Sequence, residues 1–479
     1  MTMNKRKALG LKKKYKIYKK KIEKLQEDDD GSITSDDVDE LEMETLGTIV
    51  NDEYIIIKYI GRGTFSRVWL SFHIKTSEYY VLKIYFSDAE NEFKKEKAIL
   101  SKTTSNNMKY NIGFINSFSC SFDKNSSSYV IVLPYLGLTL SDLCDETDRK
   151  YTLKEVKCIV NAILNSVSEL HSHNILHSDL KMDNFISDHY TNDSLDFIEW
   201  FNSLDITNKY NEITTSNTPD NFNEYNKNKK KQVKRKIKTR SIKELTRKVQ
   251  ELLRLYNDSN DELPQEPINN QNNDESNKDN TETSNNETEN ETENETSNNE
   301  TSQNDDINIP ELNWYLVDFS NSILESEIDL DEEYQIRAYR SPENILASGY
   351  SYKSEVWAIG CIIWQLLTGD YIFEPELTGD ALSRDREQLS IMQKYLGKMN
   401  TDISLQSPRT FELFEDTGKV KGYKKVKREY LNDVLTEKRP DLSDLEIDKV
   451  CNYLQNLWNY NIEKRFSIKE CINHEFLIT

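Results

Sequence analysis

The sequence predicts an α+β protein in which a small β-rich lobe precedes a larger α-rich lobe. Before about residue 134, short runs of β-branched and aromatic residues are separated by turn residues, as in antiparallel strands. After about residue 138, apolar residues recur at the spacing of amphipathic helices. Between Ser187 and Asn313 this pattern fails, which indicates a long insertion within the second lobe.

The expected elements follow the chain in that order. In the first lobe the sequence predicts one helix at 90–101 and strands at 54–60, 68–70, 79–84 and 129–133. In the second lobe it predicts helices at 153–172, 355–367, 384–396 and 443–458.

The composition narrows the function classes. A formal net charge of −21 disfavours direct nucleic-acid binding and suits a basic protein partner. The six Cys residues include no C-x-x-C pair, so we expect reduced thiols in an intracellular protein rather than disulfides or a zinc site. No apolar run approaches the roughly 18 residues of a membrane span, and the Lys-rich N-terminus lacks the apolar core of a secretory signal.

The insertion and the N-terminal segment have biased compositions. Residues 1–25 are basic and residues 27–44 are acidic, which is typical of a solvated tail. Within the insertion, residues 227–240 are densely basic, and the next residues to Tyr256 have apolar side chains at helical spacing. Residues 257–308 are of Asn/Glu/Thr/Ser low complexity and should be disordered, because they cannot bury enough apolar area to offset the ordering entropy. The basic run is either a nuclear-import signal or a plain solvated segment.

The segment His177-Ser178-Asp179-Leu180-Lys181-Met182-Asp183-Asn184 carries the strongest chemical signal. Phosphoryl transfer to a hydroxyl needs a carboxylate that orients the acceptor, an oxygen ligand for Mg²⁺ and a cation near the transferred group. One loop could supply all three, from Asp179, Asn184 and Lys181. An H-x-D motif alone is weak, so the surrounding motifs must decide.

Upstream, a glycine-rich segment joins two predicted strands, where backbone N–H groups can approach phosphates closely. Alone it could be an ordinary hairpin turn. Lys83 lies in an apolar strand and needs an anionic partner there, for which Glu96 on the next helix is the natural candidate. The candidate nucleotide-binding residues of the segment are Ile60, Gly61, Arg62, Gly63, Thr64, Phe65, Ser66, Arg67 and Val68.

Downstream, three further motifs appear in order. Asp318 ends an apolar strand and is followed by Phe319 and Ser320, which is where a phosphotransferase could hold Mg²⁺. Glu343 follows the segment Arg337 to Pro342 and should pair with a late Arg, for which Arg465 fits. With Glu355 and the residues after it, six motifs lie in one order along the chain, so coincidence is negligible.

These motifs resemble those of the protein-kinase superfamily over residues 48–187 and 313–479, and most closely those of the SR protein kinases. The similarity to the latter is carried by Gly61-x-Gly63-x-Phe65-Ser66-x-Val68-Trp69-Leu70, His177-Ser178-Asp179, Gly369-Asp370-Tyr371-Ile372-Phe373-Glu374-Pro375, Ser383-Arg384-Asp385 and the long insertion. The resemblance implies four segments: a charged tail (1–47), the N-lobe with the catalytic loop (48–187), a largely disordered insertion (188–312) and the rest of the C-lobe (313–479).

The resemblance also implies a function. ATP and Mg²⁺ would bind in the interlobe cleft, with the adenine near Pro134 and Leu136 and with Leu133 as gatekeeper. The substrates would be proteins phosphorylated on Ser in Arg/Ser-rich or other basic segments. We expect a monomeric enzyme of the cytoplasm, the nucleus or both.

Several residues depart from the family pattern. Ser320 replaces the Gly of a D-F-G motif, Ile336 replaces a Thr that bonds the catalytic Asp and Lys, and Glu355 replaces an Asp that supports the catalytic loop. These departures leave a pseudokinase scaffold open as an alternative. Lys394 replaces an acidic residue of the substrate-docking groove, whereas Asp370 and Glu387 preserve its negative charge. A CDC-like or dual-specificity kinase with another acceptor sequence is the second alternative.

Activation is expected not to need phosphorylation of this chain. Ser178 stands where most kinases have the Arg that reads a phosphorylated activation loop. Glu332 and Glu333 lie close in sequence to Arg337, where related kinases carry an acidic or phosphorylated residue. The hypothesis is that these acids hold the loop open.

Overall fold

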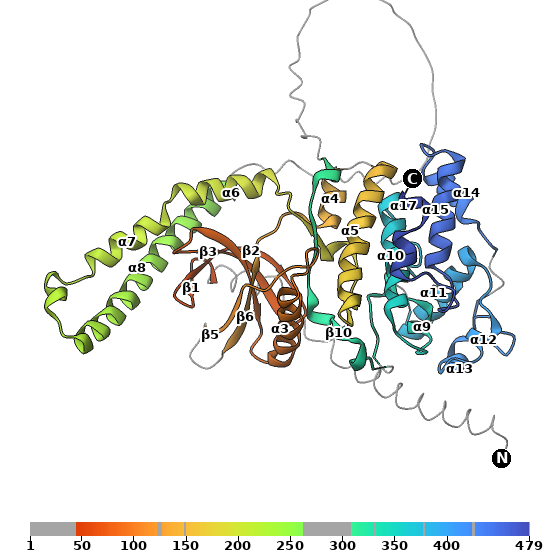
Figure 1. The fold of residues 1–479 in the computed structure, drawn as a ribbon, viewed down its shortest axis with the longest axis horizontal. Helices are drawn as coiled ribbons and strands as arrows, with labels where there is room; N and C mark the ends of the chain where they lie inside the picture. The colour runs from red at the N-terminus through yellow and green to blue at the C-terminus, as the bar shows by residue number, and fades with distance from the viewer. Residues whose placement is uncertain are drawn as a thin grey trace, which may run out of the picture.

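The computed structural model describes residues 45–121, 127–147, 150–261, 308–329, 332–376, 379–423 and 427–478. Three parts follow one another across the molecule (Figure 1): a hairpin of long helices, a β-sheet and a bundle of helices. The sheet and the bundle are the two lobes that the sequence predicts, so the α+β, two-lobed architecture is confirmed. The hairpin belongs to the insertion.

The sheet of the first lobe is antiparallel, in the order β1-β2-β3-β4-β6-β5. Its strands are β1 (Ile49–Val50), β2 (Tyr54–Arg62), β3 (Ser66–His73), β4 (Glu78–Tyr85), β5 (Asn116–Cys120) and β6 (Ser128–Pro134). Helix α3 (Glu90–Ser105) follows β4 and buries Phe93, Ile99 and Leu100. All four predicted strands and the predicted helix of this region lie within these elements.

The second lobe is helical. Its helices are α4 (Leu140–Thr147), α5 (Leu153–Ser172), α9 (Pro342–Ile345), α10 (Tyr352–Thr368), α11 (Ala381–Leu396), α12 (Thr401–Ser404), α13 (Thr410–Leu413), α14 (Leu431–Lys438), α15 (Asp444–Leu457), α16 (Ile468–Ile472) and α17 (Glu475–Ile478). The four predicted helices are present, with α15 one residue shorter at each end than expected. Within the described ranges, no helix is both long and apolar enough to cross a membrane.

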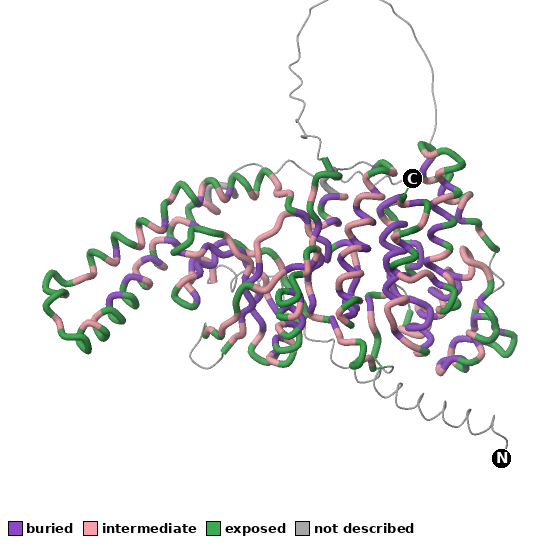
Figure 2. The backbone as a smooth tube through the Cα atoms, in the orientation of Figure 1, coloured by how far each residue is buried: buried purple, intermediate pink, exposed green. Residues whose placement is uncertain are grey.

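Helices α5 and α10 form the centre of this lobe, and Figure 2 shows buried residues along both. Helix α5 starts at a capping box, in which the Thr152 side chain accepts from the Glu155 backbone and Glu155 bonds back to Thr152. It then buries apolar residues on one face, from Val156 to Leu170. Helix α10 is buried on almost all sides, which explains why its sequence is apolar with little amphipathic pattern.

Two short strand pairs hold the loops that connect the lobes. Strand β7 (Ile175–Leu176) pairs with β10 (Ile323–Leu324), and β8 (Phe185–Ser187) pairs with β9 (Trp314–Leu316). The second pair closes the base of the insertion, because Ser187 lies opposite Trp314. Beyond it, the Asn313 side chain donates to Asp188 Oδ2 (2.7 Å), so the insertion leaves and re-enters the fold at one point.

The insertion folds into three helices that cover a face of the sheet. These are α6 (Asn192–Ser203), α7 (Ile206–Ser216) and α8 (Lys227–Asp261). An apolar cluster joins them to β2 and β3: Ile55, Ile57, Leu70, Phe72, Ile74, Phe197, Phe201, Ile206, Ile213, Leu245, Val249 and Leu253. The Tyr79 hydroxyl also donates to Asn202 Oδ1 on α6 (2.8 Å).

The expectation of a largely disordered insertion is therefore wrong for residues 192–261. The helical spacing noted up to Tyr256 lies within α8, but the average composition concealed the apolar faces of the other helices, because polar and basic residues fill the remaining positions. Burial on the sheet supplies the stabilisation that isolated helices of this composition would lack. Residues 262–307, which include most of the low-complexity segment, lie outside the described residues, as does the charged tail up to residue 44.

The apolar cluster predicts how the insertion is held. Phe201 is 1% exposed and stacks on Phe72 and Phe197, so Phe201→Ala should cost about 3–5 kcal/mol of packing between hairpin and sheet. Hydrogen exchange measured by mass spectrometry should speed up in residues 192–256 and stay unchanged in α5 and α10. Leu195→Ala, on the same helix with a 47% exposed side chain, is the control and should change neither region. Unchanged exchange in the Phe201 variant would show that the hairpin does not depend on this contact.

Candidate active site

The loop from His177 to Asn184 lies between β7 and β8, at the junction of the two lobes. His177 is fully buried, and its Nε2 donates to the Val317 carbonyl oxygen (2.8 Å). The Ser322 hydroxyl donates to the His177 carbonyl oxygen (3.1 Å). These bonds join the loop to the segment that carries Asp318.

Asp179, Lys181 and Asn184 come together within this loop. The Lys181 ammonium lies 3.5 Å from Asp179 Oδ2, and the Asn184 amide donates to the Asp179 backbone oxygen (2.7 Å). The Asn321 amide reaches the same Oδ2 at 3.4 Å. Asp179 Oδ1 is buried and makes no hydrogen bond with the described residues. The carboxylate is thus held through Oδ2, whereas the buried Oδ1 has no hydrogen-bond partner among the described residues.

Glu355 supports this loop despite being one methylene longer than the expected Asp. Its side chain is fully buried; Oε1 accepts from the Ser178 backbone N–H (2.7 Å) and Oε2 lies 2.7 Å from His171 Nε2. Ser178 has a left-handed backbone (φ 65°), and its carbonyl oxygen accepts from Gln335 N–H (2.9 Å). The Glu therefore performs the supporting contact, and His171 on α5 takes up its extra length.

Lys83 on β4 lies between two carboxylates. Its ammonium contacts Glu96 on α3 (2.8 Å) and Asp318 (2.7 Å), so the predicted Lys83–Glu96 pair is present. Burial opposes the charge on Lys83, but the two carboxylates outweigh it and raise the pKa of Lys83. Burial likewise opposes the charge of Asp318, but Lys83 outweighs it and lowers the pKa of Asp318. Lys83 is cationic and Asp318 anionic at neutral pH.

Ser320 does not strain the backbone after Asp318. The left-handed residue of this segment is Asp318 itself (φ 59°), and Ser320 lies in a short 3₁₀ turn, Phe319–Asn321. The Ser320 hydroxyl donates to Asp318 Oδ1 (2.8 Å), a contact that Gly could not make. Phe319 is fully buried, with its ring 5.3 Å from that of His177.

The glycine-rich segment forms the end of the β2–β3 hairpin. Gly61 pairs with Val68, and Gly63 N–H donates to the Ser66 carbonyl oxygen (2.8 Å). No atom lies within 4 Å of where a Cβ of Gly61 would be, so the backbone there is open to a ligand. Around these glycines, the structure places Ile60 and Arg62 on β2, Thr64 and Phe65 in the turn, and Ser66, Arg67 and Val68 on β3. Ile60 and Phe65 are 48% and 38% exposed, so a ligand could contact both side chains.

Strand β6 continues into the segment that links the lobes. Leu133 is buried opposite Val81, and Pro134 lies opposite Tyr80 at the end of the strand. Leu136 follows in the link, and Gly137 N–H then donates to the Ser187 carbonyl oxygen. A Cβ on Gly137 would lie 1.7 Å from the His189 backbone oxygen, so only Gly fits this crossing.

The residues present fit ATP and Mg²⁺. Gly61 provides backbone that can approach phosphates, and Lys83 provides a fixed cation two strands away, with Val68 between them. Asn184 uses its amide nitrogen on Asp179, which leaves its carbonyl oxygen for a cation next to the Asp318 carboxylate. No cluster of three or more His, Cys, Asp or Glu suited to a metal occurs among the described residues. Mg²⁺ commonly uses one or two protein oxygens together with phosphate oxygens and water.

The segment before α9 differs from expectation in its ion pairs. Glu333 contacts Arg340 (2.9 Å) and not Arg337, whose guanidinium instead contacts the buried Asp385. Ile336 is 40% exposed and makes no polar contact with Asp179. The Glu333–Arg340 ion pair lies within this segment, and the hypothesis that Glu332 and Glu333 hold the loop open stays a prediction.

The predicted link between Glu343 and Arg465 is present. Both residues are buried, and the guanidinium makes two bonds with the carboxylate (2.7 and 2.9 Å). Burial opposes the charge of Glu343, but Arg465 lowers its pKa below the ordinary value. This pair joins the start of α9 to the segment just before α16.

Four residues near the site were not identified from the sequence. Tyr85 donates to Glu96 beside Lys83, Asn321 reaches Asp179, His171 holds Glu355, and Gly137 permits the close crossing at the interlobe link. Tyr85 could have been found, because it lies two residues after Lys83 on the same strand and so on the same face. The other three contacts join segments far apart in sequence, and no local pattern marks them.

The Lys83 pairing predicts a pH-dependent stability. Lys83→Met removes the cation and leaves Glu96 and Asp318 facing one another without a countercharge. We expect the free energy of unfolding at pH 7 to fall by about 3 kcal/mol, the low end for a buried pair, because Asp318 is partly open to solvent. Urea denaturation at several pH values measures it.

The direction of the pH effect follows from the carboxylate pKa values in the wild type and in the variant. In the wild type, the lowered pKa of Asp318 contributes stability above its unfolded-state pKa, which is lost as pH falls through the folded-state value. In the variant both carboxylates protonate more readily, so the deficit should shrink between about pH 7 and pH 4. Lys75→Met, which removes an exposed partner of Glu53, should cost under about 1 kcal/mol. A deficit that stays constant with pH would contradict this account.

Comparison with known proteins identifies the family of this chain. The protein kinase domain matches residues 54–217 and 307–477. The serine/threonine-protein kinase SKY1 of Saccharomyces cerevisiae is 30% identical over 176 residues, which is 36% of this chain and 23% of that protein. The serine/threonine-protein kinase SRPK of Physarum polycephalum is 24% identical over 90% of this chain and 87% of its own.

A third relative is the dual specificity protein kinase lkh1 of Schizosaccharomyces pombe. It is 32% identical over 167 residues, 34% of this chain and 23% of that protein. The match to SKY1 and lkh1 therefore spans less than a quarter of each of those proteins. The domain match covers both lobes and omits most of the insertion. The chain belongs to the protein kinase family, and SR protein kinases are among its relatives.

Proposed function

We propose that the protein is an ATP- and Mg²⁺-dependent kinase that phosphorylates Ser or Thr in other proteins. The observation that carries this proposal is the Lys83 ammonium bridging Glu96 and Asp318, next to a loop that brings Asp179, Lys181 and Asn184 together. The ion pairs of Lys83 with Glu96 on α3 and with Asp318 fix the two lobes relative to each other. That is the arrangement that phosphoryl transfer requires.

Each group would have one role. Residues Ile60 to Val68 and Lys83 would hold the phosphates, Pro134 and Leu136 would bond the adenine, and Asn184 with Asp318 would hold Mg²⁺. The bound Mg²⁺ and ATP supply a phosphoryl group whose negative charge is partly neutralised. Lys181 would stabilise that charge from the acceptor side.

Asp179 would receive the acceptor hydroxyl. Its Oδ2 already contacts Lys181, Asn184 and Asn321, whereas Oδ1 is without a hydrogen bond among the described residues. We infer that this carboxylate accepts the hydroxyl proton of Ser or Thr and aligns the oxygen for attack. Lys181, as opposed to the residue patterns of tyrosine kinases, favours these smaller acceptors.

Serine in Arg/Ser-rich or other basic segments is the proposed substrate class. The net charge of −21 favours a basic partner, and two relatives are named SRPK and SRSF protein kinase 3. Ion pairs offset two of the charges in the proposed groove. Asp370 pairs with Lys438, and Lys394 pairs with Glu429, so Glu387 is left as the main groove acid.

Two alternatives have observations behind them. A dual-specificity kinase with another acceptor sequence is favoured by the identity to lkh1 and by Lys394. A pseudokinase scaffold draws on Ser320, Ile336 and Glu355. The geometry of Ser320 and Glu355 supports the site, which leaves Ile336 as the departure that counts toward a scaffold.

Localisation and assembly belong to the same proposal. We propose a monomer that acts in the cytoplasm, the nucleus or both. The candidate import run 227–240 lies on helix α8, where all but three of its side chains are exposed. An import receptor could therefore reach most of its Lys and Arg residues.

Asp179→Asn tests the catalytic role. With Mg²⁺, radiolabelled ATP and an Arg-Ser repeat peptide, we expect kcat to fall by at least a thousandfold while ATP affinity stays within about threefold, because Asp179 touches the acceptor and not the nucleotide. Asp183→Asn removes an exposed carboxylate from the same loop and should leave kcat within about twofold. Absence of transfer by the wild type despite tight ATP binding would establish the scaffold, and a preference for peptides without Arg would establish the other kinase class.

Ile336→Thr tests the missing hydroxyl. The resemblance implies that a Thr here bonds Asp179 and Lys181, so the variant should raise kcat severalfold with little change in melting temperature, since Ile336 is 40% exposed. Ile336→Val has the shape of Thr without its hydroxyl and should leave kcat unchanged. Equal rates for Thr and Val would show that Asn321 and Asn184 already position Asp179 fully.

A further inference from the structure

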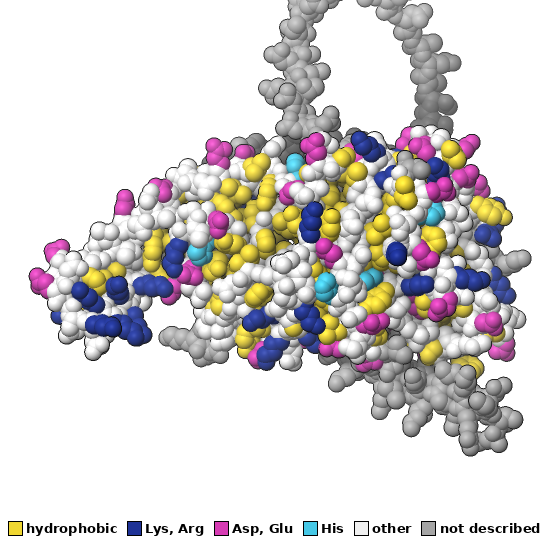
Figure 3. Space-filling model, in the orientation of Figure 1, with side chains coloured by type: hydrophobic (Ala, Val, Ile, Leu, Met, Phe, Trp, Pro, Cys, Tyr) yellow, Lys and Arg dark blue, Asp and Glu magenta, His cyan; other side chains and the backbone are white. Residues whose placement is uncertain are grey.

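The free end of the insertion carries a strong positive charge. Nine of the fourteen residues from Lys227 to Arg240 are Lys or Arg, and none is Asp or Glu. Figure 3 shows Lys and Arg side chains gathered at the end of the hairpin that lies farthest from the helical bundle. This basic end has no role in the site between the lobes, and a basic substrate would be repelled by it.

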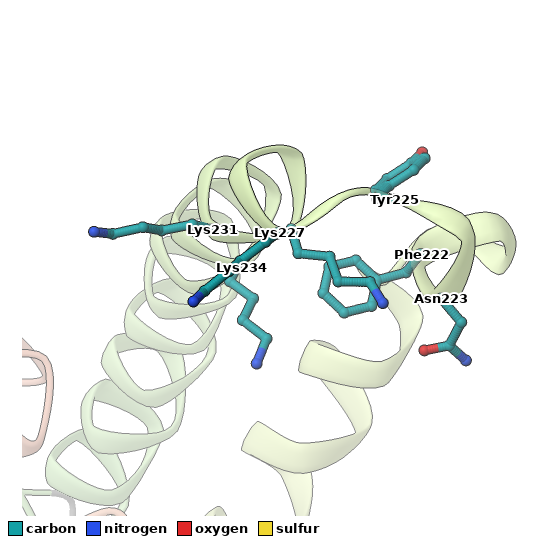
Figure 4. Close-up of a pocket in the computed structure, with 7 residues that line it drawn as sticks. Phe222, Asn223, Tyr225, Lys227, Lys231 and Lys234 are labelled. Atoms are coloured by element: carbon teal, nitrogen blue, oxygen red, sulfur yellow. The ribbon is translucent and has the colours of Figure 1, made fainter.

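A pocket lies where the turn η2 (Asp220–Glu224) meets the start of α8 (Figure 4). Its volume is about 580 Å³. Lys227, Lys230, Lys231 and Lys234 of α8 line it, together with Phe222, Asn223 and Tyr225 at the turn. We call these four lysines and two aromatic residues the tip pocket. Cations above an apolar wall suit a chain that carries carboxylates and a few apolar side chains.

The tip lysines have no counterions in the described part of the chain. Their spacing of three, four and seven residues puts them on one face of α8, where like charges destabilise a helix. Among the described residues, no carboxylate lies within 4.0 Å of any of the four ammonium groups. Further along α8, Lys238 does pair with Asp52 (2.9 Å). An acidic ligand would remove the repulsion that remains at the tip.

An acidic segment directly precedes residues that lie against α8. Residues 27–44 contain ten Asp or Glu and no Lys or Arg. The first described residues after this segment lie against α8, because the Gln250 side chain donates to the Leu46 carbonyl oxygen (3.2 Å) and packs on Gly47. From Gln250 to Lys227 the helix spans roughly 35 Å at about 1.5 Å per residue. Eighteen extended residues reach up to about 60 Å, so the segment can reach the tip pocket.

We propose that the acidic segment 27–44 docks on the tip pocket of the same chain, through Lys227, Lys230, Lys231 and Lys234. The complementary charges and the shared attachment to α8 favour this ligand over one from outside, because tethering gives the segment a high effective concentration. Docking would hold the N-terminal segment against the insertion and exclude other polyanions from the basic end. It does not depend on the proposed kinase activity.

The test uses full-length protein and a fluorescent synthetic peptide of residues 27–44. A tail-neutralised variant has each Asp of that segment changed to Asn and each Glu to Gln. Fluorescence anisotropy should show the peptide binding this variant at least tenfold more tightly than the wild type, whose own segment occupies the pocket. Binding should weaken at least tenfold between 50 and 200 mM salt, because exposed charges are screened.

Matched charge reversals locate the binding surface. In the tail-neutralised background, Lys227→Glu, Lys230→Glu, Lys231→Glu and Lys234→Glu together should abolish peptide binding. The control changes four exposed cations of α8 outside the pocket by the same total charge: Arg235→Glu, Lys236→Glu, Arg240→Glu and Lys243→Glu. It should keep the affinity within about fivefold. Circular dichroism of both variants checks that α8 remains folded.

Carbodiimide cross-linking of the wild type gives a direct readout. Peptide mapping should find amide links between the tip lysines and carboxylates of residues 27–44. Equal peptide binding by the wild type and the tail-neutralised variant, or equal loss in both charge-reversal variants, would overturn the proposal. Links that instead join the tip lysines to residues 262–307, or pocket-dependent binding of RNA or anionic vesicles without peptide binding, would also overturn it by identifying another occupant.

Discussion

The buried contact of Lys83 with Glu96 and Asp318 is the constraint on which the rest of the structure depends. A Lys ammonium at the inner face of a sheet is unfavourable unless anions surround it. One anion comes from helix α3 of the first lobe and the other from the segment after β9, across the junction. Both carboxylates can contact the Lys83 ammonium only if the two lobes take a defined relative position. That position also brings the His177–Asn184 loop beside Asp318.

The remaining contacts extend this arrangement outward. The His177–Val317 bond joins the loop to the segment that carries Asp318. Glu355 on α10 and His171 on α5 support the same loop. Arg465, just before α16, holds Glu343 at the start of α9. On the other side, the insertion covers β2 and β3, the same hairpin whose end forms the glycine-rich turn. The Tyr190 hydroxyl, just before α6, donates to the Tyr135 carbonyl oxygen in the interlobe link (3.0 Å). The insertion is therefore part of the folded body and contacts the ATP-binding lobe directly.

Much of the fold and of the site could be predicted because it follows from patterns within short stretches of the sequence. The strands and helices follow from the spacing of apolar residues. An anionic partner for Lys83 could be predicted because burying an unpaired cation is unfavourable. Helices α6 and α7 and the first part of α8 were missed because their apolar residues are few and become decisive only against the exposed face of the sheet. Asn321, His171 and Gly137 were missed since their partners are 142, 184 and 52 positions away in sequence, so no local pattern could show them. Glu355 looked like a defect until His171 was seen to take its second oxygen.

Phosphosite mapping tests the central claim most directly. Purified wild-type protein, with Mg²⁺ and ATP, would be added to a cell extract whose own kinases have been inactivated, and new phosphopeptides would be identified by mass spectrometry. The account predicts new phosphoserine or phosphothreonine sites, enriched in flanking Arg, that are absent when the Asp179→Asn protein replaces the wild type. The same phosphopeptides with both proteins, or none with either, would contradict it.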